Sequence, residues 1–427
     1  MSAQPENQSF LRRILIGLIG NVMEWYDFAV YGYFAGTIGR LFFPSDNPVV
    51  SLMASFGAFA AGFLVRPLGG LLFGRIGDLV GRQRAMFLSV ITMAVPTVLM
   101  ALLPTYETIG FFAPLLLILL RMVQGLSVGG EFTSSLIFMV EKAPSNRKAF
   151  SAVWGAWGAS AGTLLGSGVG FLMAYLLTPL ELEMWGWRLA FLSGGAVAFV
   201  ALWLRSGKQQ EDSPNLSKTP VRDIFTIHRS RLVKIVLLNI GHTVGFYTIF
   251  VYAVSFLEQT AHFSHEKALR NNSIAMLFLL AVMPFAAKLA DRIGHRKVLS
   301  FGFSLLAIAA VPLFHIMGEG IRWVTIACEL GLALPLAILA GAIFATNVEL
   351  MPREVRCSGL AFAYNLSVGV FGGMTPMAVT WMTAHIKNFT APGYWVAGAA
   401  AISVATILLA STTADKPQME NEVVKYG

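Results

Sequence analysis

Residues 21–33 read NVMEWYDFAVYGY and lie inside the first long apolar segment of the chain. At 100° per residue in an α-helix, Glu24, Asp27 and Tyr31 fall within about 60° of one another and form one polar stripe. A charge at the centre of a bilayer costs about 2.5 to 3.5 kcal/mol on insertion scales, so it normally faces a bundle interior or a water-filled cavity. The stripe therefore predicts the lining of a transport pathway. The alternative is that one carboxylate only pairs with an interior arginine and holds helices together.

The composition is that of a membrane protein. The chain has 427 residues, of which 56% are hydrophobic and 13% charged, and its mean hydropathy is +0.66. Apolar runs of about 20 residues, long enough to cross roughly 30 Å of hydrocarbon as helix, recur along nearly the whole length. The runs are continuously apolar and do not alternate, which disfavours a β-barrel. We therefore expect an all-α protein that crosses the cell inner (plasma) membrane many times and is surrounded by the lipid bilayer.

The apolar runs predict twelve transmembrane helices in two pseudo-symmetric six-helix bundles. The predicted spans cover residues 13–38, 50–74, 84–103, 114–140, 149–177, 187–204, 234–257, 271–290, 298–317, 322–348, 358–384 and 394–411. The bundles are assigned to residues 1–204 and 234–411, with a polar linker over 205–233 and a short tail over 412–427. If the N-terminus is cytoplasmic, the cytoplasmic segments hold 23 Lys and Arg residues and the external segments hold 6. This bias places both termini in the cytoplasm, and it explains the net charge of +8 better than a nucleic-acid partner does.

Two loops repeat at equivalent positions of the two halves. The sequence FGRIGDLVGRQRAM at 73–86 follows the second predicted span, and AKLADRIGHRKVL at 287–299 follows the eighth, as in a duplicated transporter. Their candidate gate residues are Gly74, Asp78, Arg82 and Arg84 in the first copy, and Asp291 and Arg292 in the second. The second copy has Ala287 and His295 where the first has Gly74 and Arg82. The alternative is that the arginines only anchor the loops in the cytoplasm.

Further polar residues at membrane depth accompany the stripe. Arg66 lies about eleven residues from the end of its span, which at 1.5 Å per residue is about 16 Å from the membrane face. In the fourth span Arg121, Gln124 and Glu131 share one helix face within about an 80° arc. Three more residues are candidates for the wall of a cavity, with packing as the alternative for each: His242, Tyr247 and Asn365.

The motifs do not indicate an enzyme, a cofactor or a metal site. Two GxSxG matches at 125–129 and 158–162 lie inside apolar helices, without the strand-turn-helix context of a nucleophilic serine. No HExxH, CxxC or P-loop sequence is present. Cys328 and Cys357 fall in an apolar segment and in a loop, so neither suggests a disulfide or a metal ligand. We therefore expect a protein that is not an enzyme and that uses no cofactor.

Several motifs, in order along the chain, resemble those of one known family. They are EWYDFAVYG in the first span, RPLGGLLFGRIGD in the second, RMVQGLSVGGEF in the fourth, WGWRLAFL at the sixth, and ELMPREVRCSGLAFAYN running into FGGMTP through the tenth and eleventh. By these motifs the chain resembles the metabolite:H+ symporter family of the major facilitator superfamily, which includes bacterial carriers for proline and glycine betaine, 2-oxoglutarate, citrate and shikimate. The resemblance implies two bundles that rock about a central site, and loops at 73–86 and 287–299 that latch the cytoplasmic side.

The resemblance and the buried charges together predict proton-coupled uptake of a small carboxylate-bearing metabolite, either an organic acid or a zwitterionic osmolyte. We expect Asp27 or Glu24, followed by Glu131, to carry the proton, because burial favours the neutral acid whereas pairing with arginine favours the carboxylate. We expect Arg66 and Arg121 to attract the substrate carboxylate, because arginine offers a fixed bidentate fork. The other predicted substrate contacts are Tyr31, Gln124, His242, Tyr247 and Asn365. The partners are then a small molecule and protons, and we expect a monomer to be functional.

Other functions stay open at the level of the sequence. The same cavity could serve an uncoupled facilitator or exchanger, for which an uncoupler would leave uptake unchanged. A membrane sensor or a membrane enzyme is an alternative from a different class, although no catalytic constellation supports an enzyme.

Overall fold

The computed structural model describes residues 21–80, 82–129, 131–205, 224–386 and 388–414. The side chains of residues 74–75, 77–80, 82–87, 131, 201–205 and 410–414 also lie outside the described part. All regular secondary structure in the described ranges is helical. Within these ranges the helices group into twelve spans in the predicted order, and nine of them are apolar helices of at least 18 residues that could cross a membrane. The prediction of an all-α membrane protein with twelve helices is therefore confirmed.

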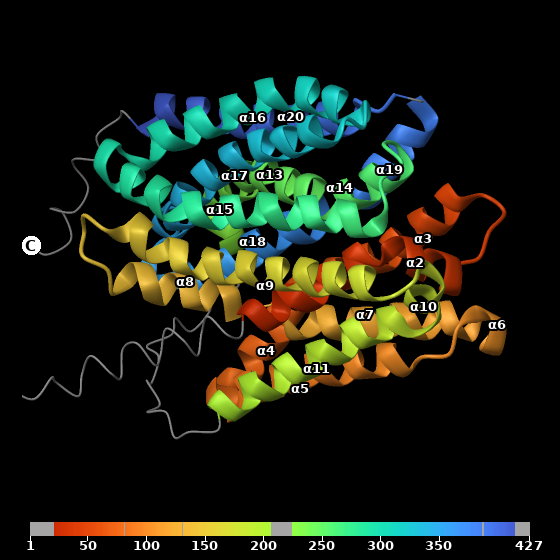
Figure 1. Ribbon diagram of the computed structural model, residues 1–427. Helices are drawn as coiled ribbons and strands as arrows, with labels where there is room; N and C mark the ends of the chain where they lie inside the picture. The colour runs from red at the N-terminus through yellow and green to blue at the C-terminus, as the bar shows by residue number, and fades with distance from the viewer. Residues whose placement is uncertain (1–20, 81, 130, 206–223, 387, 415–427) are drawn as a thin grey trace, which may run out of the picture.

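The first half of the chain, coloured red to yellow in Figure 1, packs lengthwise along the second half, coloured green to blue. Its helices are a first helix over 21–33, α2 (Ala35–Phe42), α3 (Pro48–Leu64), α4 (Arg66–Val80), α5 (Arg82–Leu102), α6 (Tyr106–Ile109), α7 (Phe112–Ser127), α8 (Glu131–Glu141), α9 (Lys148–Leu176), α10 (Pro179–Glu181), the π-helical η1 (Leu182–Gly186) and α11 (Trp187–Arg205).

The second half repeats this pattern of long spans. Its helices are α13 (Arg229–Tyr247), the π-helical η2 (Thr248–Tyr252), α14 (Ala253–Gln259), α15 (His265–Ile293), α16 (His295–Gly318), α17 (Arg322–Leu350), the 3₁₀ turn η3 (Arg353–Val355), α18 (Arg356–Leu366), the π-helical η4 (Ser367–Gly372), α19 (Thr375–Ile386) and α20 (Ala391–Ala414). Most of the predicted linker, residues 206–223, lies outside the described residues. The division into bundles over 1–204 and 234–411 therefore stays a prediction.

Several spans are interrupted within their length, and three of these interruptions lie close to the buried charges. α3 ends at Leu64 and α4 begins at Arg66, because Pro67 has no backbone N–H to donate to the preceding turn. α7 ends at Ser127, before α8 begins at Glu131. In the eleventh span the six-residue π-helical segment η4 separates α18 from α19. Local departures of this kind are frequent at functional sites in helical proteins.

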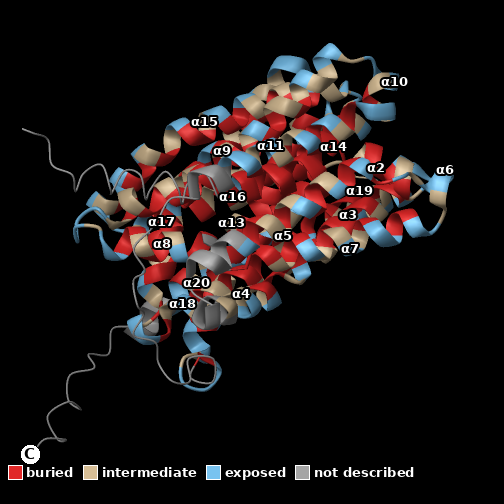
Figure 2. Ribbon diagram, turned by 90° about the horizontal axis from the view of Figure 1, so that it is seen from below, coloured by how far each residue is buried: buried red, intermediate tan, exposed pale blue. Residues whose placement is uncertain are grey.

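Glycines bring helices into backbone contact in the first half. Gly162 of α9 packs on the first helix so closely that a Cβ would lie 2.3 Å from the carbonyl oxygen of Val22. A Cβ on Gly129, after α7, would lie 1.9 Å from the backbone nitrogen of Gly70 in α4. Small residues permit such contacts between membrane helices, where close packing replaces the hydrophobic effect as the driving force. Figure 2 shows the result: buried residues follow the axis of the bundle, and exposed ones cover its flanks and ends.

The two ends of the bundle differ in charge. One end, named the basic end from here on, holds the turns between α8 and α9, between α15 and α16, and between α17 and α18. Basic residues gather in and beside these turns, namely Lys142, Arg147, Lys148, Arg292, Arg296, Lys297, Arg353 and Arg356. The other end, named the opposite end, holds the short helices α6 and α10 (Figure 1).

Candidate functional site

A cavity lies between the two halves of the chain. Trp25 and Phe132 line it from the first half, and its lining in the second half includes His242, Tyr247 and Tyr364. The volume of the cavity is about 30 Å³, which is room for water but not for an organic solute. The cavity therefore admits only water-sized molecules as it stands.

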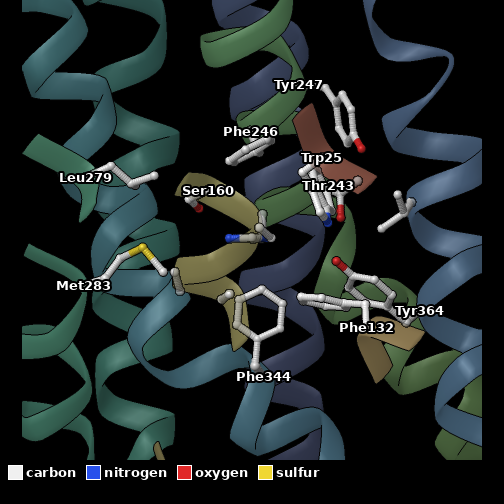
Figure 3. A pocket seen from close by; sticks show the side chains of 15 residues that line it. Trp25, Phe132, Ser160, Thr243, Phe246, Tyr247, Leu279, Met283, Phe344 and Tyr364 are labelled. Atoms are coloured by element: carbon white, nitrogen blue, oxygen red, sulfur yellow. The ribbon is translucent and has the colours of Figure 1, made fainter. Parts of the chain in front are cut away.

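Aromatic rings make up much of the cavity wall. Figure 3 shows six of them around the same space, namely Trp25, Phe132, Phe246, Tyr247, Phe344 and Tyr364. The ring centroids of Trp25 and Phe246 lie 5.7 Å apart, and those of Phe132 and Tyr364 lie 5.1 Å apart. Among the described residues, no Lys, Arg, Asp or Glu side chain lines the cavity. The faces of such rings carry a negative quadrupole and attract cations.

Asp27 lies in a hydrogen-bonded network within the first half. Its Oδ1 accepts from Thr97 Oγ1 at 2.7 Å. Its Oδ2 accepts from Gln124 Nε2 at 2.7 Å and from Arg121 Nη1 at 3.1 Å. The side chains of Arg121 and Asp27 are 0% and 3% exposed, so this ion pair is fully buried. One carboxylate thus joins the first helix, α5 and α7, and losing it would leave Arg121 as an uncompensated buried charge.

Glu24 pairs with a different buried arginine, Arg66. Arg66 Nη2 donates to Glu24 Oε1 at 2.8 Å, and Arg66 Nε donates to Asn365 Oδ1 at 3.3 Å. Asn365 belongs to α18 in the second half, so this pair, unlike that of Asp27, contacts both halves. Arg66 Nη1 has no hydrogen-bond partner among the described residues. The guanidinium therefore retains a donor for a further acceptor.

A single ring, Phe28, lies between the two arginines. Arg66 Cζ is 5.5 Å and Arg121 Cζ is 5.1 Å from its centroid. Arg121 also lies 4.0 Å over the ring of Tyr31, whose hydroxyl donates to the Ser55 carbonyl at 3.1 Å. The polar stripe thus places its two carboxylates against separate arginines. The sequence left open, as the structural alternative, that one carboxylate pairs with an interior arginine, and in the structure both do.

The predicted substrate residues divide into two groups. His242 and Tyr247 line the cavity. The others lie outside its lining in this conformation, namely Arg66, Arg121, Gln124, Tyr31 and Asn365. Sequence reasoning missed further lining residues, namely Trp25, Phe132, Thr243, Phe344 and Tyr364. Trp25 carried a usable signal because it lies inside the quoted stretch next to Glu24. The other aromatic residues carried none, since aromatic residues in apolar helices mostly serve packing.

One predicted proton site cannot be compared with the structure. The side chain of Glu131 lies outside the described residues, and the structure gives its position only as the first residue of α8. Its role stays a prediction.

At the basic end, polar contacts join the two halves. Asp291 of α15 accepts from the backbone N–H groups of Ala149 and Phe150, both at 2.9 Å, at the start of α9. Those N–H groups have no partner inside their own helix, so the carboxylate caps α9 from the other half of the chain. Lys148 Nζ lies 2.9 Å from Glu349 Oε1. A further contact across the halves at this end joins Arg356 Nη1 to Glu141 Oε1 at 2.5 Å.

The other predicted gate residues have no such contact across the halves among the described side chains. Arg292 is exposed, and His295 beside it lies 3.3 Å from Glu349 through Nδ1 and Oε2. The gate residues of the first copy have side chains outside the described residues, namely Gly74, Asp78, Arg82 and Arg84. The structure therefore gives contacts for the second loop and leaves the first loop as a prediction.

The halves also touch at the opposite end. Asn272 Nδ2 of α15 donates to Tyr33 Oη at 2.9 Å and to Ser167 Oγ at 3.1 Å. Nearby, a Cβ on Gly32 would lie 2.6 Å from a methyl group of Val251. The two halves therefore contact each other at both ends of the bundle, with the cavity between them.

Comparison with known proteins identifies the family. A profile of the Major Facilitator Superfamily matches residues 17–377. The glycine betaine/proline/ectoine/pipecolic acid transporter OusA of Dickeya dadantii is 34% identical over 422 residues, covering 95% of this chain and 84% of that protein. The citrate-proton symporter of Klebsiella pneumoniae is 31% identical over 388 residues, covering 89% and 87%. These relatives confirm the resemblance to proton-coupled metabolite carriers.

Solved structures agree on the fold. The partially occluded inward open conformation of the xylose transporter XylE from E. coli superposes with a TM-score of 0.76 at 18% identity, covering 96% of this chain and 99% of that one. At that identity the likeness concerns the fold. The chain therefore belongs to the Major Facilitator Superfamily of membrane transporters.

Proposed function

We propose that this transporter couples the inward movement of protons to the uptake of a small zwitterion that carries one carboxylate and one alkylated ammonium group. One observation carries the proposal. A buried arginine with a free donor, Arg66, lies beside a cavity whose wall consists largely of aromatic rings. Relatives of this chain carry proline, betaine and organic acids by name. The chemistry of the cavity favours the zwitterions among these.

The carboxylate of such a substrate has a defined place beside the cavity. Arg66 Cζ lies 5.1 Å from the ring centroid of Phe63, and that ring lies 5.4 Å from the ring of Tyr247. Tyr247 lines the cavity, and its hydroxyl has no hydrogen-bond partner among the described residues. A small carboxylate at this edge of the cavity would take the Tyr247 hydroxyl and the free Nη1 of Arg66 as charge-assisted donors.

The ammonium group fits the rest of the cavity. An alkylated ammonium presents an apolar surface with a diffuse positive charge. Each contact of such a group with an aromatic face contributes about 0.5 to 2 kcal/mol to binding, and more when the group is desolvated. A di- or tricarboxylate would instead need two or more cationic side chains, and the described cavity wall holds none. The same wall would leave the extra carboxylates buried without partners, at a cost of several kcal/mol per ion.

Asp27 is our proposed proton carrier, and Glu24 is the proposed partner that substrate displaces from Arg66. Asp27 is held by donors of the first half alone, so protonation alters that network without touching the second half. Glu24 shares Arg66 with Asn365 of the second half. Glu131 stays the alternative carrier. One proton moved through about 100 mV supplies about 2.3 kcal/mol, so no nucleotide site is needed.

Alternating access follows from the contacts at the two ends. We place the basic end in the cytoplasm, with both chain termini, because Lys and Arg concentrate on the inner side of membranes. Release to the cytoplasm then requires the cap of Asp291 on α9 and the ion pair of Lys148 with Glu349 to break. Residues 1–204 and 234–411 move as the two bodies, joined by residues 205–233, in a monomer within the lipid bilayer.

Uptake of a labelled panel into proteoliposomes tests the proposal. The panel contains glycine betaine, proline, citrate, 2-oxoglutarate and shikimate, each with and without an imposed inward proton gradient. We expect glycine betaine or proline to accumulate above the external concentration with the gradient, and to equilibrate only when an uncoupler is added. Accumulation of citrate or 2-oxoglutarate alone would contradict the assignment of the cavity, and gradient-independent equilibration would contradict proton coupling.

A further inference from the structure

Three helix interruptions meet at one side chain, Asn365. It lies in α18, two residues before the π-helical segment η4. Its Oδ1 accepts from Nε of Arg66, the first residue of α4 after the break at Val65. Its Nδ2 donates at 2.6 Å to the carbonyl oxygen of Gly129, which lies in the break between α7 and α8. Asn365 thus ties the second half of the chain to both interrupted spans of the first half.

The arginine end of this bridge is the group that pairs with Glu24. Arg66 holds Glu24 through Nη2 and Asn365 through Nε. Both bonds come from one planar guanidinium, whose donors keep a fixed arrangement. A rotation of the guanidinium towards another anion, or away from a protonated Glu24, therefore changes its bond to Asn365.

The carbonyl end of the bridge belongs to a rigid part of the first half. A Cβ on Gly129 would lie 1.9 Å from the backbone nitrogen of Gly70, and a Cβ on Gly125 would lie 1.7 Å from the carbonyl oxygen of Gly62. The spans that contain α4 and α7 therefore move as one body. Movement of α18 away from that body must break the bond of Asn365 to Gly129, and η4 provides a local departure from the α-helix where the eleventh span can adjust.

We infer that Asn365 is a positioning residue that couples the pair of Arg66 and Glu24 to the joining of the two halves. While Arg66 is paired with Glu24, Asn365 bridges Arg66 and Gly129 and holds α18 on the first half. When a substrate carboxylate displaces Glu24 and redirects the guanidinium, the bridge opens and the halves are free to separate. The inference rests on the proposed function, and it gives Asn365 a role distinct from the substrate contact predicted from the sequence.

The variant Asn365→Leu tests the inference, since it is close in size to asparagine and removes both bonds of the bridge. In this variant the contact between the halves no longer depends on how Arg66 is paired. We expect exchange of labelled substrate at equal concentrations to continue with a KM within threefold of that of the unmodified protein. Accumulation driven by an imposed membrane potential falls at least tenfold. A side chain that contacts substrate would instead raise the KM of exchange and of accumulation together.

Asn347→Leu is the matched control. Asn347 is buried like Asn365, but its amide exchanges hydrogen bonds with Asn239 at 3.0 Å in both directions, inside the second half. Losing that pair leaves the bridge intact, so the ratio of accumulation to exchange should stay at the unmodified value. An equal loss of this ratio in both variants would overturn the inference, because it would then reflect general loosening of the bundle.

The variant Asn365→Asp is an independent test of the inference. It replaces Asn365→Leu if that variant cannot be reconstituted into proteoliposomes. The ionised side chain keeps an acceptor for Arg66 but turns an oxygen towards the Gly129 carbonyl, whereas the protonated acid donates to it. The charged groups that face this position are Arg66 and, across it, Glu24. The ratio of accumulation to exchange should therefore rise as pH is lowered equally on both sides, relative to the unmodified protein.

The outcomes separate this inference from the proposed function. Full accumulation by Asn365→Leu, or a pH profile of Asn365→Asp identical to that of the unmodified protein, would refute the coupling role and leave proton-driven uptake standing. If the unmodified protein itself exchanges without accumulating, proton coupling fails. The KM of exchange in Asn365→Leu would then still decide, because a large increase would make Asn365 a substrate contact and overturn its positioning role.

Discussion

Neutralising Asp27 should separate movement of substrate from coupling to protons. Asp27→Asn keeps the size of the side chain and one acceptor oxygen, but it fixes the group in an uncharged form that cannot release a proton. The variant should therefore exchange labelled substrate across the membrane and lose the ability to accumulate it. With about 2.3 kcal/mol from one proton at 100 mV and about 1.4 kcal/mol per tenfold ratio, accumulation should fall from about 50-fold to about unity.

The same substitution has a cost in stability that the structure allows us to work out. Asp27 accepts three hydrogen bonds, from Thr97, Gln124 and Arg121. Bonds to a charged group contribute about 1.5 to 3 kcal/mol and neutral ones about 0.5 to 1.5, so three bonds lose about 3 kcal/mol. This agrees with about 3 to 5 kcal/mol for breaking a buried ion pair from one side. At about 2.1 cal/mol/K per residue over 427 residues, the melting temperature should fall by roughly 3 to 5 °C.

A double variant distinguishes loss of the ion pair from unrelated damage. Arg121→Met alone leaves Asp27 buried without its cation, whereas Asp27→Asn with Arg121→Met leaves no unpaired charge. The fall in melting temperature of the double variant should be much smaller than the sum of the falls in the two single variants, because the two residues share one interaction. The reasoning is refuted if Asp27→Asn accumulates substrate like the unmodified protein, or if the two shifts in melting temperature simply add.

Three further predictions concern other parts of the molecule. Trp25→Leu should raise the KM for a quaternary ammonium substrate about 2- to 30-fold in uptake assays, because it removes one aromatic face worth about 0.5 to 2 kcal/mol, and Trp25→Phe should raise it less. Asp291→Asn weakens the cap on α9, so a cysteine placed at Ser160 in the cavity wall should react faster with a polar maleimide from the basic end; an unchanged rate would contradict the latch. Gly129→Ala should abolish the yield of folded protein, whereas Gly168→Ala, which has nothing within 4 Å of its added Cβ, should express normally.

The helices were predictable because a bilayer leaves the backbone little choice. Inside hydrocarbon every N–H and C=O needs a partner, so long apolar runs form helices almost regardless of their sequence. The residues at which the helices begin and end were less predictable. α13 begins at Arg229 and α15 at His265, against predicted starts at 234 and 271, because polar helical turns extend beyond the apolar part of each span. Hydropathy detects the apolar part of a helix and not these turns.

The burial of the two acidic residues on the first helix was predictable from the sequence, whereas their pairing was not. Spacing on the first helix put Glu24 and Asp27 on one face, and the structure has both side chains buried there. Spacing gives no information on which neighbouring helix approaches which residue. The assignment of Asp27 to Arg121 and of Glu24 to Arg66 depends on how the first helix, α4 and α7 pack together. Most rings of the cavity wall were missed for the same reason, since they come from both halves of the chain.

The most direct test of proton-coupled transport is to measure proton movement itself. Proteoliposomes with a pH dye trapped inside and no imposed ion gradient are exposed to an outward or inward gradient of glycine betaine or proline. The account predicts internal acidification on inward substrate movement, lost in Asp27→Asn while substrate exchange persists. Substrate entry with no change in internal pH in the unmodified protein would contradict it.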